Sequence, residues 1–256
     1  MYNLLISLAV AIALGAGATL AFGGWLYAII PFLLVFVLAY FLLARRSFRQ
    51  VEAISREVGA IIEQASKQAS GTRKQRQAAQ LISAAMDRAI GVLRNAYKVG
   101  LWQFGVKSQI DAQIGQLLFM DKRFDQARPY LTTGFARIWT TRTMLAVCHF
   151  KGKEWAKMSA AFDEAMKNNK KQGIVYSVYA WCLMQAKSMG DASERQNKAL
   201  AVLSQGKEAT DGKDPILLRN LDAVRNGKKL NMGGYQQQWW MFHLEQPNLA
   251  AQRPQI

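Results

Sequence analysis

No charged side chain occurs in the first 44 residues of this 256-residue chain. Residues 4–22 and 25–43 form two apolar stretches of 19 residues each, separated only by Gly23 and Gly24. A helix of that length spans about 28 Å, close to the roughly 30 Å hydrocarbon core of a bilayer. The short connection favours an antiparallel pair with both ends on the same side. Residues 1–44 are therefore predicted to be a transmembrane helical hairpin.

Basic residues follow the second apolar stretch, and none precedes the first or lies in the connection. The nearest are Arg45, Arg46, Arg49 and Arg56. Because Lys and Arg flank transmembrane helices on the cytoplasmic side, we expect an integral protein of the inner or plasma membrane with both termini and the helical domain in the cytoplasm. A cleavable signal peptide would need a positive N-terminal region and a shorter apolar core. A periplasmic domain would put the arginines on the wrong side.

The formal net charge is +16, of which residues 45–107 and 108–256 each carry +8. Positive charge beside a bilayer attracts anionic lipid, by about 1 kcal/mol per basic residue near the surface. The four arginines are therefore candidate contacts for membrane lipid, and a solvated basic surface is the alternative. Nucleic acid is a less favoured partner, because the basic residues lack interleaved exposed aromatic side chains for base stacking.

Small residues recur at every fourth position of the first apolar stretch, namely at Ala9, Ala13, Gly17 and Ala21. Such a face lets helices pack closely in lipid. We expect it to contact the second helix of the hairpin, with another membrane protein as the alternative.

Residues 45–74 are predicted to be a basic juxtamembrane helix that ends in a polar joint at 66–74. Apolar residues follow a 3-4 spacing over about two heptads: Val51, Ile54, Val58, Ile61 and Ala65. This stripe indicates either packing on the rest of the domain or a seam for self-association.

Helical periodicity continues through an amphipathic lead-in, residues 75–107, and then through residues 108–229, with short polar joints between the segments. No alternating strand pattern competes with it. The predicted fold class is all-α.

A degenerate repeat of helix pairs lies within this region. One set of positions recurs with identical spacings in a second copy, and a third copy begins in the same way: Ile114, Gly115, Leu118, Phe124, Ala127, Leu131 and Gly134; Leu145, Ala146, His149, Trp155, Met158, Phe162 and Ala165; Tyr179, Ala180 and Leu183. A small residue after a large one lets the second helix of a pair approach the first closely. Pairs of this kind bury their apolar faces by stacking.

The spacing resembles the tetratricopeptide repeat over residues 108–134 and 139–165, and more weakly over 173–206. It departs from the family where Asp111 and Arg142 replace an aromatic residue that often opens the first helix. A generic helical bundle is the alternative. The resemblance implies a solenoid closed by a capping helix, with a partner groove on the first helix of each pair. In this register the groove residues are Gln109, Ala112, Gln116, Phe119, Thr143, Val147, Phe150, Ser177, Trp181 and Met184.

The C-terminal tail, residues 230–256, has little periodicity but carries Tyr235, Trp239, Trp240 and Phe242. Disordered segments are poor in aromatic residues, so we expect this tail to dock. The sequence leaves open whether it docks in the chain's own groove or on a partner.

The sequence contains no phosphate-loop, HExxH, CxxC or GxSxG motif, and its two His and two Cys are isolated. We therefore expect no enzyme, no cofactor and no metal site. The leading hypothesis is a membrane-anchored adaptor or scaffold that recognises an apolar segment of a protein partner. One alternative is a structural or accessory subunit of a larger membrane complex. A third, weaker one is a binder of anionic lipid or nucleic acid through the basic segment.

Overall fold

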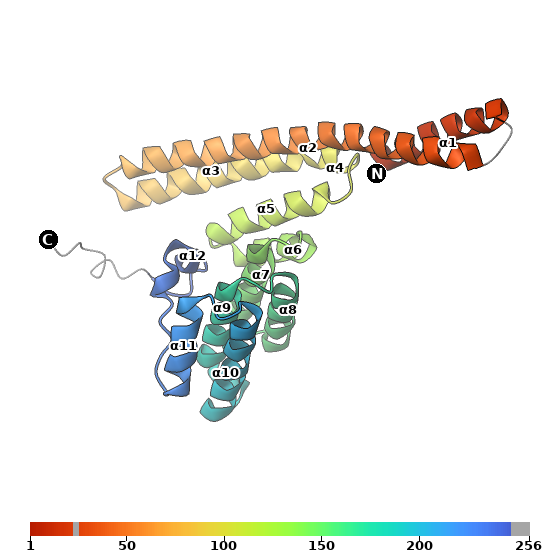
Figure 1. Ribbon diagram of the computed structural model, residues 1–256. Helices are drawn as coiled ribbons and strands as arrows, with labels where there is room; N and C mark the ends of the chain where they lie inside the picture. Colours follow the sequence, from red (N-terminus) through yellow and green to blue (C-terminus); the bar gives the residue numbers. More distant parts are fainter. Residues whose placement is uncertain (23–25, 247–256) are drawn as a thin grey trace. The chain divides into compact units, whose positions relative to one another are not determined.

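The computed structural model describes residues 1–22 and 26–246, and every regular element in those ranges is a helix (Figure 1). The predicted all-α class is therefore confirmed. The chain divides into two compact units, residues 1–114 and 115–256. The first unit contains the apolar hairpin and the basic helices. The second contains a set of paired helices and the C-terminal tail.

Two apolar helices, α1 (Tyr2–Phe22) and α2 (Leu26–Ser70), pack side by side. They are antiparallel, because Asn3 Nδ2 at the start of α1 donates to Ser47 Oγ far along α2, at 2.9 Å. Both helices are long and apolar enough to cross a membrane by length and composition. Most of their apolar surface is left uncovered by the rest of the chain. The predicted connection, Gly23 and Gly24, lies outside the described residues, as does Trp25.

The prediction for the small-residue stripe of α1 is wrong. Ala9, Ala13, Gly17 and Ala21 are exposed, and a side chain added at Gly17 would meet nothing within 4 Å. The buried positions of α1 recur at the same spacing on another face: Asn3, Ser7, Ala11 and Gly15. Helix α1 therefore has small or polar residues on two faces. The hydrogen bonds of Asn3, at the start of the helix, favour burial of the face that carries Asn3 and Ala11.

Helix α2 does not end where its apolar segment ends. It runs without interruption for 45 residues, through the apolar segment and then through the basic segment to Ser70. The predicted polar joint is shorter than expected, since α2 reaches Ser70 and α3 (Gln75–Asn95) starts five residues later. α3 packs along α2. Val51, Val58 and Ala65 of the heptad stripe are buried, as are Ile90 and Leu93 of α3. Ile54 and Ile61 are half-buried, so the stripe packs mainly within the chain.

A short helix, α4 (Tyr97–Gly100), and an irregular loop connect α3 to α5 (Val106–Met120). The division between the two units falls inside α5. In its first part, Asp111 Oδ1 accepts a hydrogen bond from Tyr97 Oη at 2.5 Å, and Gln113 Nε2 donates to Ser55 Oγ at 3.2 Å. These bonds attach the beginning of α5 to α4 and α2.

Residues 115–246, the described part of the second unit, contain six further helices of more than one turn: α6 (Phe124–Thr133), α7 (Trp139–Lys151), α8 (Trp155–Asn168), α9 (Gly173–Gln185), α10 (Ala192–Ala209) and α11 (Pro215–Arg225). Within it, α7 packs against α8, α9 against α10, and α10 against α11. A single 3₁₀ turn, η1 (Lys187–Met189), lies in the longer loop between α9 and α10.

Two glycines allow helices of this unit to pack closer than a side chain at those positions would permit. A Cβ on Gly115 would lie 2.8 Å from Leu131 Cδ2, and one on Gly206 would lie 2.7 Å from Tyr176 Cγ and from Leu217 Cδ1. Both distances are well below the optimal separation of two carbon atoms, about 3.5–4.0 Å. The end of α5 therefore approaches α6 closely, and α10 approaches both α9 and α11.

The chain reverses direction after α11. Asp214 caps the start of α11, because its Oδ1 accepts hydrogen bonds from the backbone N–H groups of Ile216 at 2.9 Å and Leu217 at 3.0 Å. Asn220 holds the returning segment, since its Oδ1 accepts from the N–H of Asn231 at 2.8 Å. A 3₁₀ turn, η2 (Gly233–Tyr235), and a one-turn helix, α12 (Gln237–Trp240), then place the aromatic residues of the tail.

Candidate functional site

The two central helices of the second unit are covered on all sides. Every residue of α9 from Gly173 to Leu183 is buried, as is every residue of α7 from Thr141 to Cys148. Because successive residues of a helix point around its whole circumference, runs this long require cover on every face. The neighbouring helices α8 and α10 supply part of the cover. α6 also packs on α7, and α11 on α9. The described part of the tail, residues 230–246, adds contacts with α9 and with both ends of α7.

Tyr235 links the tail to α9 and α11 through its hydroxyl group. Its Oη lies 3.0 Å from Ser177 Oγ and donates to Asp214 Oδ2 at 2.9 Å. Burial raises the pKa of Tyr235 well above its usual value, and the adjacent Asp214 carboxylate raises it further. The phenol therefore remains a hydrogen-bond donor over the whole physiological range. A Cβ on Gly173 would lie 2.0 Å from Asp214 Oδ2, so only glycine leaves room for that carboxylate.

Trp239 is the largest side chain that is fully buried in the described ranges. Its ring meets that of Trp181 edge to face, with centroids 5.3 Å apart. Each indole N–H donates to a different oxygen of Glu245, at 3.0 Å from Trp181 and 3.1 Å from Trp239. One carboxylate therefore accepts a hydrogen bond from each indole N–H. Without it, both N–H groups would be buried without a partner.

His243 attaches the tail to the end of α5. Its Nε2–H donates to the backbone carbonyl of Met120 at 3.1 Å, and its ring stacks on Phe119 with centroids 6.0 Å apart. Lys151 Nζ donates to the His243 carbonyl at 2.9 Å. Burial lowers the pKa of His243, and the positive charges of Lys122 and Lys151 lower it further. Burial and these charges therefore favour the neutral imidazole in this position.

Most of the predicted groove residues are brought together, but they are covered. Phe119, Ser177 and Trp181 contact the tail directly, and Phe150 packs edge to face on Trp181 at 5.9 Å. Thr143 and Val147 are fully buried in α7, and Met184 is half-buried in α9.

The remaining predicted groove residues lie along α5. Gln116 is half-buried and hydrogen-bonds to Thr140 Oγ1 at 2.9 Å. Gln109 and Ala112 precede it in the part of α5 that belongs to the first unit, where Ala112 is fully buried. A buried alanine offers nothing to a partner. Gln109 is half-buried, so its side chain stays partly accessible in the first unit.

The tail docks on its own unit, which answers the question that the sequence left open. Tyr235, Trp239 and Phe242 are buried, and Phe242 meets Trp139 edge to face at 6.1 Å. Trp240 is different, because it is half-buried and lines an open hollow formed by the tail itself. Three of the four aromatic residues singled out in the sequence therefore point into the unit.

The predicted lipid contacts are exposed on α2. Arg45, Arg46 and Arg49 line one surface hollow together with Leu42. Arg56 lies further along the helix, where it forms an exposed ion pair with Glu52 at 3.0 Å. An exposed pair of this kind contributes little to stability, typically below about 1 kcal/mol. The first three arginines therefore form the basic cluster closest to the apolar part of α2.

The cysteines are unreactive in their present positions. Cys148 and Cys182 are free and buried, and burial raises the pKa of the Cys148 thiol to about 12 and that of Cys182 well above its usual value. No group of three His, Cys, Asp or Glu side chains that could hold a metal ion occurs in the described part of the chain.

Sequence reasoning missed a polar cluster between the start of α1, the middle of α2 and the loop after α4. Asn3 Nδ2 donates to Ser47 Oγ and to Gln103 Oε1, the latter at 3.1 Å, and Gln103 Nε2 donates to Tyr40 Oη at 2.8 Å. Asn3, Ser47 and Gln103 are buried. The only available signal was the isolated Asn3 before the apolar stretch. Its partners are 44 and 100 residues away, so no local pattern links them.

Comparison with known protein-family models, with curated proteins and with solved structures finds no match to this chain. In the part of the chain that the structure describes, the protein is all-helical and has two apolar N-terminal helices of membrane-spanning length.

Proposed function

We propose that this chain is a membrane-anchored adaptor whose second unit recognises an apolar, aromatic-bearing segment of another protein. One observation carries the proposal. The face formed by α7 and α9 already holds such a segment, the chain's own tail, through Trp239 and Phe242. A face that buries large aromatic side chains and satisfies their indole N–H groups can accept a similar segment from a partner.

The exposed surface of the apolar hairpin supports membrane anchoring. Leu20 is 88% exposed on α1, and Ile30 is 73% exposed on α2. Uncovered aliphatic side chains along two adjacent helices form a larger apolar surface than soluble proteins leave in water. The proposed orientation, with both termini and the second unit in the cytoplasm, rests on the arginines that follow the apolar part of α2.

Packing within the second unit supports the tetratricopeptide-like interpretation. α7 pairs with α8 and α9 pairs with α10, in the order that the repeat requires. Gly115 occupies a position that the repeat gives to a small residue, and it lies at a close contact between helices. Under this proposal α11 is the capping helix.

The docked tail adds a condition to the adaptor proposal. A partner that uses the same face has to displace Tyr235, Trp239 and Phe242, and must therefore compete with a segment present at high effective concentration. Partner binding is expected to be weak in the wild-type chain and stronger when the tail is weakened.

The test is recovery of partners by the full-length chain, extracted from native membranes in mild detergent. Trp239→Ala should increase recovery of a specific protein, because it removes the main contact of the competing tail. Trp240→Ala is the matched control, since this adjacent aromatic side chain lies outside the buried contact. Phe119→Ala, Phe150→Ala and Trp181→Ala, each combined with Trp239→Ala, should reduce recovery again. Equal recovery in all variants would remove the face from the proposal.

A second candidate function is a structural subunit of a larger membrane complex. The exposed stripe of Ala9, Ala13, Gly17 and Ala21 favours it, because this close-packing face has no partner within the hairpin. Extraction in mild detergent followed by size analysis distinguishes the two. Ala13→Leu should release the chain from a large complex if the stripe packs on another subunit. It should leave the behaviour of a freely tethered adaptor unchanged.

A further inference from the structure

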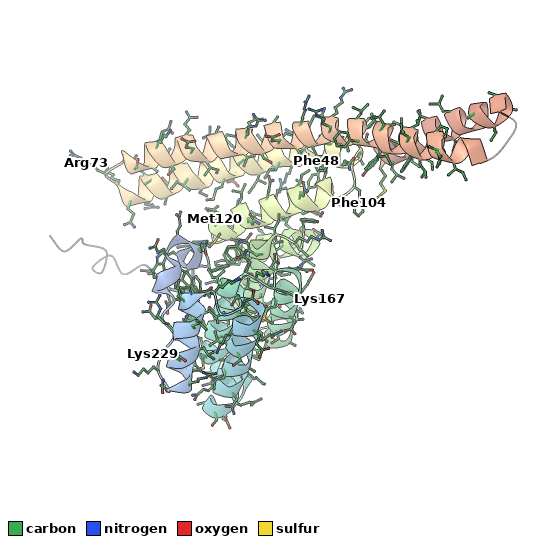
Figure 2. The ribbon with its side chains drawn as sticks, in the orientation of Figure 1. Phe48, Arg73, Phe104, Met120, Lys167 and Lys229 are labelled. Carbon is green, nitrogen blue, oxygen red and sulfur yellow. The ribbon has the colours of Figure 1, made fainter. Side chains whose placement is uncertain are left out.

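The loop between α4 and α5 exposes three large apolar side chains. Leu101 and Trp102 are exposed, and Phe104, labelled in Figure 2, is 74% exposed. These residues lie outside both apolar helices, and the sequence pattern does not mark them. A cluster of exposed apolar side chains on one short loop requires an explanation, whereas single exposed residues do not.

The loop is fixed to the start of α1 by its backbone. Tyr2 N–H donates to the Leu101 carbonyl at 3.2 Å, and Asn3 N–H donates to the Trp102 carbonyl at 3.1 Å. The ring of Tyr2 meets that of Trp102 at 5.3 Å. These bonds satisfy N–H groups in the first turn of α1 that have no partner within the helix. The loop therefore keeps a defined position relative to α1.

Gln103 fixes the loop from its other side. Its side chain is buried and bonds to Asn3 and to Tyr40, while its neighbours Trp102 and Phe104 are exposed. A buried amide that is hydrogen-bonded through both its oxygen and its nitrogen holds the loop in one orientation. Trp102 and Phe104 are therefore exposed on a loop whose conformation is fixed by hydrogen bonds.

The contacts of the loop determine its position along the axis of the hairpin. They involve Tyr2 and Asn3 of α1 and Tyr40 of α2, and Asn3 also reaches Ser47. The apolar part of α2 ends and its arginines begin between residues 40 and 47. The exposed loop side chains are thus at the boundary where hydrocarbon would give way to lipid headgroups.

We propose that residues 101–104 are a third membrane-contacting element, which places Trp102 and Phe104 at the interface between acyl chains and headgroups. The inference rests on the proposed membrane hairpin. Trp side chains favour this zone because their rings are part apolar and part polar. One pocket of about 260 Å³ is lined by Trp102 together with Arg46, Ser47 and Gln50, so a phosphate group can lie between the apolar loop and Arg46.

The test measures depth in a bilayer at three single sites of the full-length chain reconstituted in phospholipid vesicles. An environment-sensitive fluorophore is attached to Phe104→Cys, to Leu38→Cys in the apolar part of α2, or to Gln64→Cys in its basic extension. All three side chains are exposed, so replacement leaves the packing intact. The native Cys148 and Cys182 are buried and remain unlabelled. Quenching by aqueous iodide and by lipids that carry quenchers at known depths is then compared.

The expected result is a graded one. Iodide should quench the label at 104 several-fold less than the label at 64, and lipids with quenchers near the headgroups should quench it most. The label at 38 should respond to quenchers deep in the acyl chains. Adding Gln103→Ala should increase iodide access at 104, because the loop loses its two side-chain hydrogen bonds.

Other results overturn the inference in distinguishable ways. If position 38 lies in lipid while 104 is as accessible to iodide as 64, the hairpin stands and the loop contact is wrong. If 104 is protected from iodide but no lipid quencher reaches it, protein covers the loop and the membrane contact is again wrong. If position 38 itself is accessible to iodide, both the hairpin and the loop contact fail.

Discussion

Trp181 of α9 and Trp239 of the tail donate their indole N–H groups to the same carboxylate, although they are far apart in the chain. Their rings meet edge to face with centroids 5.3 Å apart, and Glu245 accepts from one indole with each oxygen. The tail is therefore held on α9 by an apolar contact and by a shared acceptor. Removing either part should loosen the tail and leave the helices of the second unit intact.

The first prediction changes the shared acceptor. Glu245→Gln keeps the size of the side chain but leaves one oxygen in place of two, so one buried indole N–H loses its partner. We expect the tail to be destabilised by about 1–3 kcal/mol, the cost of an unsatisfied buried donor. Hydrogen exchange of residues 230–246 measures the change. Gln246→Ala, an exposed neighbour, is the control, and equal exchange in both variants would contradict the role of Glu245.

The second prediction concerns the hydroxyl of Tyr235. Tyr235→Phe removes a group that pairs with Ser177 and donates to Asp214. It leaves the Ser177 hydroxyl buried without this partner, so docking should weaken by about 1–2 kcal/mol. Asp214→Ala should cost more, because it also removes the cap of α11. Chemical denaturation of both variants provides the measurement, and a larger loss in Tyr235→Phe would show that the cap contributes little.

The apolar patterns of the sequence were sufficient to predict the helices and the all-α class, because helix formation depends on periodicities within a few turns. The length of each apolar stretch was likewise sufficient to identify two helices that could cross a membrane. The buried face of α1 was predicted wrongly. Small residues lie on two faces, and the choice between them depends on hydrogen bonds of Asn3 with residues 44 and 100 positions away.

The candidate site was predicted in part for the same reason. The aromatic content of the tail predicted that it docks. The repeat spacing identified Phe119, Ser177 and Trp181, which contact the tail, but not Trp139 and Lys151 of α7, which also contact it. The acceptor role of Glu245 could not be predicted, because it is 64 residues from Trp181 and no spacing relates them. The tail reaches this face only because the chain reverses direction after α11. The hydrogen bond from the Asn231 N–H to Asn220 Oδ1 stabilises that reversal.

The third prediction concerns pH. The pKa of His243 is lowered from 6.5 by burial and by Lys122 and Lys151, so the undocked tail binds a proton more readily than the docked tail. Docking is therefore strongest above about pH 6.5 and weakens as the pH falls below that value. Hydrogen exchange of the tail at about pH 5 and about pH 8, corrected for intrinsic rates, tests this. His243→Gln should remove most of the dependence, and an unchanged dependence in this variant would assign it to another group.

The fourth prediction concerns the close approach of α10 to α9. Gly206→Ala adds a methyl group 2.7 Å from atoms of Tyr176 and Leu217, so these helices must separate. Overpacking of this kind costs about 1–3 kcal/mol, which outweighs the higher helix propensity of alanine. Thermal unfolding of the second unit should shift to lower temperature. Lys207→Ala, an exposed change one residue later, should leave it nearly unchanged, and a stabilised Gly206→Ala variant would show that the contact can relax.

The last prediction concerns the basic cluster on α2. Arg45, Arg46 and Arg49 are exposed and share one surface hollow next to the end of the apolar segment. Each contributes about 1 kcal/mol of attraction to an anionic surface at low salt, so Arg→Gln changes at all three should weaken the preference for anionic lipid by up to about 3 kcal/mol. Native mass spectrometry of bound phospholipid, in mixed micelles of anionic and zwitterionic lipid, measures this preference. Arg73→Gln, in the turn that follows α2, is the control, because attraction to the surface decays within about 10 Å at 0.1 M salt. A loss from Arg73→Gln equal to the loss per arginine in the triple variant would mean that net charge alone, and not this cluster, attracts the lipid.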